Sequence, residues 1–154
     1  MSKTVAVLPS KRDSGVDVTD PAISSTWNNI RTDSNEMRWM LLGIRGNSLI
    51  ELKAAGSLSI DEMISAATDD EILFGGFRTQ VGDCAKFYHF FFVGANVSGV
   101  KKGKASMYKS GVLQTLEGAH GEVSFVEGKA GLSREEIIAQ LVRLTGTPAS
   151  DIDL

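Results

Sequence analysis

The sequence is poor in cysteine and contains no long run of hydrophobic residues. Its one cysteine, Cys84, cannot form an internal disulfide, and a lone thiol favours a reducing compartment. The apolar stretch near the N-terminus runs only from Val5 to Leu8. A signal peptide needs about 7–15 apolar residues and a membrane helix about 20, so we expect neither a signal peptide nor a transmembrane segment. These absences predict a cytoplasmic protein.

The chain also lacks the residue patterns that most enzyme sites require. Its two histidines, His89 and His120, do not have the spacing of metal ligands, so we predict no metal and no cofactor. The segment Gly94–Gly99 follows an apolar strand as a phosphate-binding loop would, but Val100 stands where such a loop requires lysine. A small enzyme that uses Cys84 or His89 is an alternative hypothesis, although neither residue has a neighbouring base in the sequence.

Charge is low overall but unevenly distributed. The net charge of −3 at pH 7 argues against nucleic acid as a partner. Between residues 78 and 109, however, six basic residues stand against one acidic residue, Asp83. The basic residues are Arg78, Lys86, Lys101, Lys102, Lys104 and Lys109. Such a patch suits an acidic protein surface or a phosphate-bearing partner. The adjacent carboxylates at 69–71 we interpret as a solvated helix end.

Hydrophobic periodicity divides the 154 residues into alternating helices and strands, as expected for one domain. The predicted strands are 37–45, 48–56, 71–80, 86–93 and 122–126, and the predicted helices begin at Pro21, after Ser59, near Lys104 and after Ser133. This order predicts an α/β protein of the α+β type, with a central mixed β-sheet of five to six strands and helices on both faces. We expect a flexible N-terminal arm at 1–15, the domain at 16–146, and a flexible C-terminal tail at 147–154.

Two elements are specific enough to place in the core. Strand 86–93, KFYHFFFV, is apolar on both faces and should therefore lie inside the sheet with helices covering each side. The long helix carries one apolar stripe that should pack on that sheet, and it consists of Ala105, Tyr108, Val112, Leu116 and Ala119. Leu113 lies off this stripe, so we expect Leu113→Ala to cost little stability.

The passage from Phe92 to Lys104 reads FVGANVSGVKKGK. It resembles the strand-to-helix passage of coactosin-like proteins in the actin-depolymerising-factor homology (ADF-H) family, where an aromatic strand ends in a Gly-x-Asn-Val-Ser-Gly turn before a basic helix. The likeness extends back through 68–74, TDDEILF, and forward to 122–125, EVSF. It implies the ADF-H/gelsolin-like fold. It also implies a monomeric, non-catalytic protein of the cytoplasm and cytoskeleton that binds the side of filamentous actin.

The resemblance further implies two actin-binding surfaces. One is Lys86, the lysine that opens the central strand after the hairpin. The other is the basic first part of the long helix, which carries Lys101, Lys102, Lys104 and Lys109. We expect Lys86 to lie near Lys104 and Lys109, on the reasoning that the strand start and the helix start share one rim of the sheet.

The sequence departs from the family pattern in two places, and two other binding functions stay open. The hairpin 80–85 is shorter and less basic than in coactosins, and Leu113 occupies a position where a family lysine would be expected. One alternative is a cofilin-like factor that binds actin monomers and severs filaments. Another is a protein that binds anionic lipid through its lysines.

Overall fold

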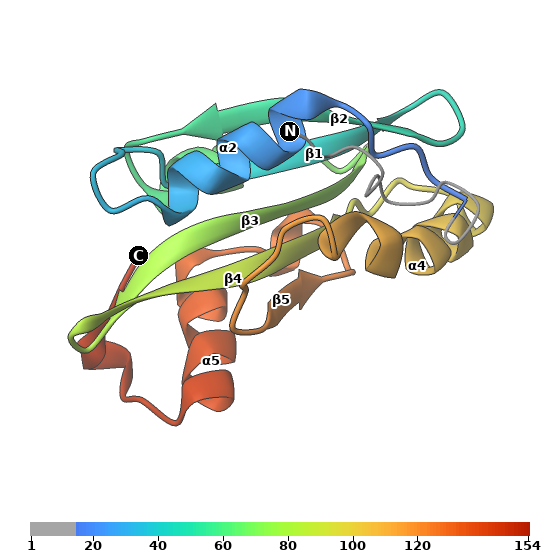
Figure 1. Ribbon diagram of the computed structural model, residues 1–154. Helices are drawn as coiled ribbons and strands as arrows, with labels where there is room; N and C mark the ends of the chain where they lie inside the picture. The colour runs from blue at the N-terminus through green and yellow to red at the C-terminus, as the bar shows by residue number, and fades with distance from the viewer. Residues whose placement is uncertain (1–14) are drawn as a thin grey trace.

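The computed structural model describes residues 15–154 (Figure 1). Its α-helices are α2 (Pro21–Arg31), α3 (Ile60–Ala66), α4 (Gly99–Leu113) and α5 (Arg134–Thr145). Its strands are β1 (Trp39–Arg45), β2 (Leu49–Gly56), β3 (Ile72–Val81), β4 (Cys84–Val93), β5 (Glu122–Phe125) and β6 (Ile152–Asp153). Short 3-10 turns lie at Lys129–Gly131 and Ala149–Asp151. Among these described residues, no helix combines the length and apolarity needed to cross a bilayer.

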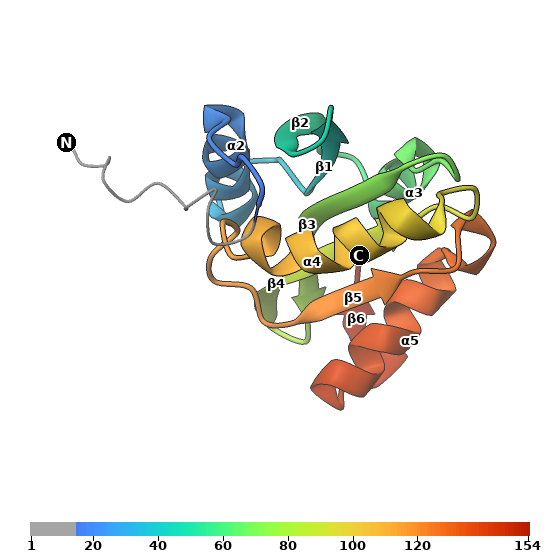
Figure 2. The same ribbon diagram turned by 90° about the vertical axis from the view of Figure 1, so that its right-hand side faces the viewer.

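The strands form one six-stranded mixed sheet in the order β2-β1-β3-β4-β5, with β6 paired to β3. All neighbouring pairs are antiparallel except β4 and β5, which are parallel because α4 carries the chain back between them. One hydrophobic cluster lies under α2 and α4, and a second lies under α3 and α5 on the opposite face (Figures 1 and 2). The predicted mixed sheet with helices on both faces is confirmed.

Strand β4 lies between β3 and β5, as its apolar sequence predicts. Its side chains alternate between the two clusters, because successive residues of a strand point to opposite faces. Phe90 and Phe92 pack with α3 and α5, whereas Phe91 and Val93 pack with α2 and α4. Since these side chains are all buried, β4 is the main link between the two halves of the core.

The start of α2 also agrees with the sequence prediction. The Asp20 carboxylate accepts a hydrogen bond from the Ala22 N–H at 3.0 Å, and Pro21 occupies the first helical position, where no N–H is required. Trp27 on this helix packs against β3 at Gly76, where a β-carbon would lie 2.4 Å from the indole ring. Glycine at position 76 therefore lets α2 lie close to the sheet.

Hydrogen bonds from neighbouring segments occupy groups on both outer edges of the sheet. On β2, the Ile50 N–H donates to the Asp17 carbonyl at 2.9 Å and the Leu52 N–H donates to the Asp20 carboxylate at 3.1 Å. On β5, the Gln140 amide from α5 accepts from the Ser124 N–H at 3.0 Å and donates to the Ser124 carbonyl at 2.8 Å. Unpaired edge groups invite pairing with another chain, and here these groups are already satisfied.

Helix α4 differs from its prediction at both ends. It begins at Gly99, five residues before the predicted start, and it ends at Leu113. Leu113 is only 4% exposed and packs in the cluster beneath α2 and α4, so the prediction that it lies off the buried stripe is wrong. The reason is geometric: Leu113 stands eight residues after the buried Ala105, a spacing that returns to the same helix face.

The two predicted termini have different outcomes. The predicted arm lies outside the described residues except for Gly15. The predicted flexible tail is instead ordered against the sheet, because β6 pairs with Gln80 and Val81 of β3. Ile152 is buried, and the Gly82 N–H donates to the Asp151 carbonyl at 2.9 Å. An apolar residue near the C-terminus and a free stretch of β3 edge explain why this segment does not fray.

Candidate functional site

The six basic residues of the charged segment do not form one patch. Arg78 is committed to the fold: its side chain is 10% exposed, it forms an ion pair with Asp33, and it donates to the Ile30 carbonyl at 3.1 Å. Its guanidinium also lies 5.3 Å from the centre of the Phe87 ring. Arg78 therefore joins α2 to the sheet and is not available to a partner.

Lys109 is also largely engaged within the molecule. Its ammonium lies 2.9 Å from the Glu122 carboxylate and 5.2 Å from the centre of the Phe91 ring. The Lys109 side chain is about one-third exposed, so its charge is partly offset before any partner arrives. Of the predicted site lysines, it is the one that the structure best explains by folding alone.

Lys86 lies far from the start of α4, contrary to the expectation that it is near Lys104. Lys86 pairs with Thr79, seven residues along β4 from Val93, which pairs with Ile72. Ile72 lines the same cavity as Lys104. Seven strand residues span roughly 23 Å, so Lys86 lies at the end of β4 opposite to Val93, the residue after which the chain continues to α4. The expectation failed because α4 begins where β4 ends and runs back beside it (Figure 2).

The remaining three lysines, Lys101, Lys102 and Lys104, lie together on the first half of α4. Ser98 caps this helix by accepting from the Lys101 N–H at 3.3 Å. No acidic residue stands in the first turn, although carboxylates are favoured there and lysines are disfavoured by the positive end of the helix dipole. Gly99 and Gly103 lower the helix propensity further. The first half of α4 is therefore less stable as a helix than its length allows. Such departures from local helix preference often occur where a surface is used for binding.

Two apolar side chains on α4 complete an exposed face that the sequence analysis missed. Val100 is 73% exposed and Met107 is 71% exposed, and both lie on the outer side of the helix. Lys104 follows Val100 by four residues and precedes Met107 by three, so the three side chains share one face. We call this the α4 face, defined as Val100, Lys104 and Met107. Val100 and Met107 lie off the predicted buried stripe and stand seven residues apart, and this spacing could have indicated a shared exposed face from the sequence alone.

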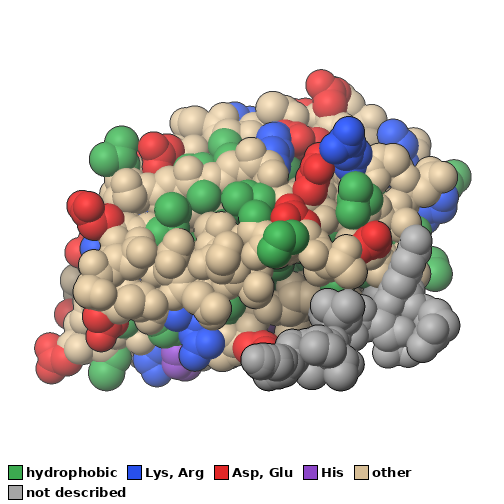
Figure 3. All heavy atoms as spheres, turned by 45° about the horizontal axis from the view of Figure 1, so that its top comes forward, with side chains coloured by type: hydrophobic (Ala, Val, Ile, Leu, Met, Phe, Trp, Pro, Cys, Tyr) green, Lys and Arg blue, Asp and Glu red, His purple; other side chains and the backbone are tan. Residues whose placement is uncertain are grey.

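The charges on another side of the molecule are arranged differently. Figure 3 shows acidic and basic side chains interspersed on that face, often next to each other. Two ion pairs of the protein join residues of the β1–β2 hairpin and the start of β3, Arg45–Glu51 and Lys53–Glu71. On α4, by contrast, Lys101, Lys102 and Lys104 form no ion pair with the residues that the structure describes.

The carboxylates at 69–71 are not a solvated helix end, as predicted, but a clamp on the turn before α4. Asp69 accepts from the Lys129 N–H at 2.6 Å and from the Ala95 N–H at 3.2 Å. These backbone hydrogen bonds, that from Lys129 first, lower the pKa of Asp69 from its ordinary value. Asp70 accepts from the Asn96 amide at 3.0 Å. The clamp fixes the direction in which α4 leaves the sheet.

The possible enzymatic residues have structural roles or no chemical neighbours. The His89 ring lies 2.7 Å from the Leu116 carbonyl, and His120 Nδ1 accepts from the Phe87 N–H at 3.1 Å. Cys84 is exposed at the β3–β4 turn. Within residues 15–154, no group of three or more histidine, cysteine or acidic residues is arranged to hold a metal.

Comparison with known families decides what kind of protein this is. Residues 15–142 match the family described as cofilin/tropomyosin-type actin-binding protein. The chain belongs to this family. Within the cofilin/tropomyosin-type family its relatives include coactosin from Dictyostelium discoideum, which is 24% identical over 139 residues that cover 87% of this chain and 94% of that protein.

Solved structures of other family members share the fold. Human coactosin-like protein has a TM-score of 0.74 at 24% identity, covering 83% of this chain and 98% of its own. Coactosin from Entamoeba histolytica has a TM-score of 0.74 at 22% identity, covering 87% and 99%. Cofilin from Streptomyces griseoflavus is less similar, with a TM-score of 0.67 at 12% identity, covering 78% and 94%. The ADF-H fold and the coactosin-like resemblance inferred from the sequence are thus confirmed.

The two segments that carry the family resemblance, 68–74 and 92–104, contact each other in the structure. Asp69 and Asp70 of the first segment accept hydrogen bonds from Ala95 and Asn96 of the second segment. The Asn96 N–H also donates to the Asp69 carbonyl at 2.9 Å. In this member of the cofilin/tropomyosin-type family, the motif is therefore the clamp that positions α4.

Proposed function

We propose that this actin-binding protein binds the side of actin filaments through the α4 face and does so without catalysis. The observation that carries the proposal is the exposure of two large apolar side chains, Val100 and Met107, on either side of an unpaired Lys104. Exposed apolar groups beside a cation are typical of a binding surface for a protein partner. The rigid helix limits the entropy lost on binding.

The position of Lys86 supports a filament as the partner. It lies roughly 23 Å along β4 from Val93, the end of the strand that leads to α4, so one partner that contacts both Lys86 and the α4 face must offer an extended surface. The side of a filament is such a surface. We assign Lys86 to a second contact, and we assign Lys101 and Lys102 to the rim of the α4 face, where they steer acidic partners. Lys109 contributes least, because Glu122 already pairs with it.

A relative provides further support. A solved structure of mouse coactosin, 24% identical and covering 84% of this chain, is described as that of an actin filament binding protein. We carry that property to this chain as part of the proposal. The same reasoning places the protein in the cytoplasm on the actin cytoskeleton, as a monomer and not as an enzyme.

Co-sedimentation with polymerised actin, alongside a monomer-binding assay, tests the proposal. Wild-type protein should pellet with filaments, and Lys104→Ala and Met107→Ala should each weaken binding about tenfold. Arg38→Ala and Leu58→Ala are matched controls, since both residues are exposed on another part of the surface, and they should bind as wild type does. Equal losses of filament affinity in the controls and in the α4 variants would contradict the proposed binding surface. Preferential monomer binding with filament shortening would favour the cofilin-like alternative.

A further inference from the structure

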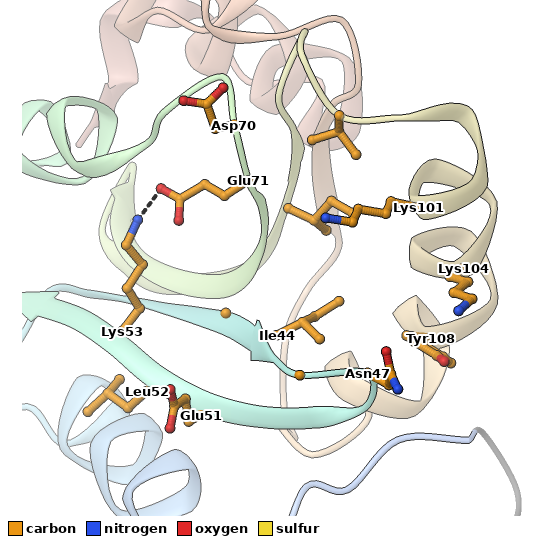
Figure 4. Close-up of a pocket in the computed structure, with 14 residues that line it drawn as sticks. Ile44, Asn47, Glu51, Leu52, Lys53, Asp70, Glu71, Lys101, Lys104 and Tyr108 are labelled. Atoms are coloured by element: carbon orange, nitrogen blue, oxygen red, sulfur yellow. Dashed lines mark hydrogen bonds and ion pairs between the residues drawn. The ribbon is translucent and has the colours of Figure 1, made fainter.

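A cavity of about 510 Å³ lies between the β1–β2 hairpin, the start of β3 and the first half of α4 (Figure 4). Its volume falls in the range of about 300–1,000 Å³ that small-molecule sites occupy. Apolar side chains from three strands and from the turn before α4 form part of its lining: Ile44, Leu52, Ile72 and Val97. The cavity thus offers an apolar surface within a mixed lining, with room for a small organic molecule.

Three of the charged groups around the cavity are held in ion pairs: Lys53 pairs with Glu71, and Glu51 pairs with Arg45. Asp70 keeps its negative charge, but its carboxylate already accepts a hydrogen bond from the Asn96 amide. These groups are therefore poor candidates for holding a ligand, because each would first have to give up its partner.

Two lysines at the cavity are different. The side chains of Lys101 and Lys104 line it, and neither forms an ion pair or hydrogen bond with the residues that the structure describes. Figure 4 shows the Lys101 side chain reaching into the cavity, and Lys104 and Tyr108 following it along α4. The positive end of the α4 dipole adds to their field. The cavity therefore combines apolar side chains with two lysines on its α4 wall that form no ion pair with the described residues.

We propose that this cavity binds a small amphipathic anion, with an aryl or alkyl body and a carboxylate, sulfonate or phosphate group. The apolar body fills the space against Ile44, Leu52 and Val97. The anionic group is held by Lys101 and Lys104, with Tyr108 on the same α4 wall and Asn47 on the β1–β2 turn as further polar lining residues. This site does not depend on the proposed binding of actin.

The geometry distinguishes this ligand from a membrane surface. A flat anionic bilayer would attract the α4 lysines alike, including Lys102, which is not part of the cavity wall. A recessed ligand would use Lys101 and Lys104 but not Lys102. Lys102 is thus a matched control on the same helix turn.

Titration with 8-anilinonaphthalene-1-sulfonate, followed by fluorescence in the absence of actin, tests the proposal. Binding should saturate at one molecule per chain. Lys101→Ala and Lys104→Ala should each lower its affinity about tenfold, whereas Lys102→Ala should stay within about twofold of wild type. Inorganic phosphate and the uncharged N-phenyl-1-naphthylamine should each bind far more weakly, because each lacks half of the ligand. Equal effects of all three lysine changes, or equal binding of the uncharged probe, would overturn the proposal.

A cavity-filling variant gives an independent test. A β-carbon added at Gly43, which lines the cavity, would contact only the Lys53 β-carbon, at 3.9 Å, so Gly43→Leu adds apolar volume on the Lys53 side of the cavity. The variant should unfold at the wild-type temperature or above and should lose probe binding. Retained binding in the folded variant would place the probe elsewhere and refute the site. If Gly43→Leu does not fold, Gly43→Ala and the lysine variants still decide the question.

Vesicles that contain phosphatidylserine separate a free ligand from a lipid headgroup. Little co-sedimentation of the protein with these vesicles is expected. Strong co-sedimentation that Lys102→Ala weakens as much as Lys101→Ala would identify a membrane surface as the partner and contradict the recessed site. Because Lys104 also belongs to the α4 face, a bound anion should reduce filament affinity, which can be measured once probe binding is established.

Discussion

Replacing Leu113 and Met107 separately by alanine should distinguish the buried and exposed sides of α4. Leu113 is 4% exposed and packs among the core residues under the helix, whereas Met107 is 71% exposed on the α4 face. Truncating a buried leucine to alanine costs about 2–5 kcal/mol, from lost burial and the cavity left behind. Leucine and alanine have nearly equal helix propensity, so the change mainly reports packing.

For a domain of this size, each 1 kcal/mol lowers the melting temperature by roughly 2–4 °C. Leu113→Ala should therefore melt about 6–12 °C below wild type if it costs about 3 kcal/mol. Met107→Ala should change the free energy of unfolding by less than about 0.5 kcal/mol, as is usual for an exposed position. Urea denaturation and thermal scans of both variants measure these effects. A loss below about 1 kcal/mol for Leu113→Ala would refute its burial. Filament affinity, corrected for the folded fraction, should fall only for Met107→Ala.

Three further variants test other parts of the structure. Gln140→Ala should leave the Ser124 backbone groups on the β5 edge unpaired and lower the free energy of unfolding by about 1–3 kcal/mol. The variant should also associate with rising concentration, as measured by light scattering, whereas a strictly monomeric variant would argue against edge closure by Gln140. Gly103→Ala should raise stability by about 0.5–1 kcal/mol in urea, because no atom lies within 4 Å of the added β-carbon; a loss would mean that this turn of α4 is strained. Hydrogen bonds that lower the Asp69 pKa stabilise the fold above the ordinary carboxyl range and are lost as pH falls below about 4, so Asp69→Asn should weaken the protein at neutral pH and flatten its acid-side stability curve. An unchanged curve would contradict the clamp.

Elements with strong periodicity could be predicted from the sequence alone. The Pro21 helix start and the interior position of β4 follow from local rules, since a helix cap and a strand apolar on both faces admit few alternatives. The burial of Leu113 was missed because the predicted stripe was too narrow: Leu113 lies beside the buried Val112 and eight residues after the buried Ala105. Placing the lysines required the direction of α4 relative to β4, which is a property of chain topology and not of residue type.

The functional features that were missed depend on contacts between distant residues. Asp69 and Asn96 are 27 residues apart, and nothing in either local sequence shows that one clamps the other. Val100 and Met107 are of residue types that usually lie in the hydrophobic core. Only the fold shows that their side of α4 faces outward. The cavity beside Lys101 likewise arises from three elements that are separate in sequence.

The closed edges of the sheet have a consequence for crowding along a filament. A partner that arrays copies of this domain side by side raises their local concentration to the millimolar range. At that concentration, open strand edges on neighbouring copies would join into a continuous sheet that no longer dissociates. Backbone groups that could pair in this way are already hydrogen-bonded within the chain, to Asp17 and Asp20 on the β2 edge and to Gln140 on the β5 edge. If the proposed filament binding holds, neighbouring copies can therefore bind densely without joining through these edges.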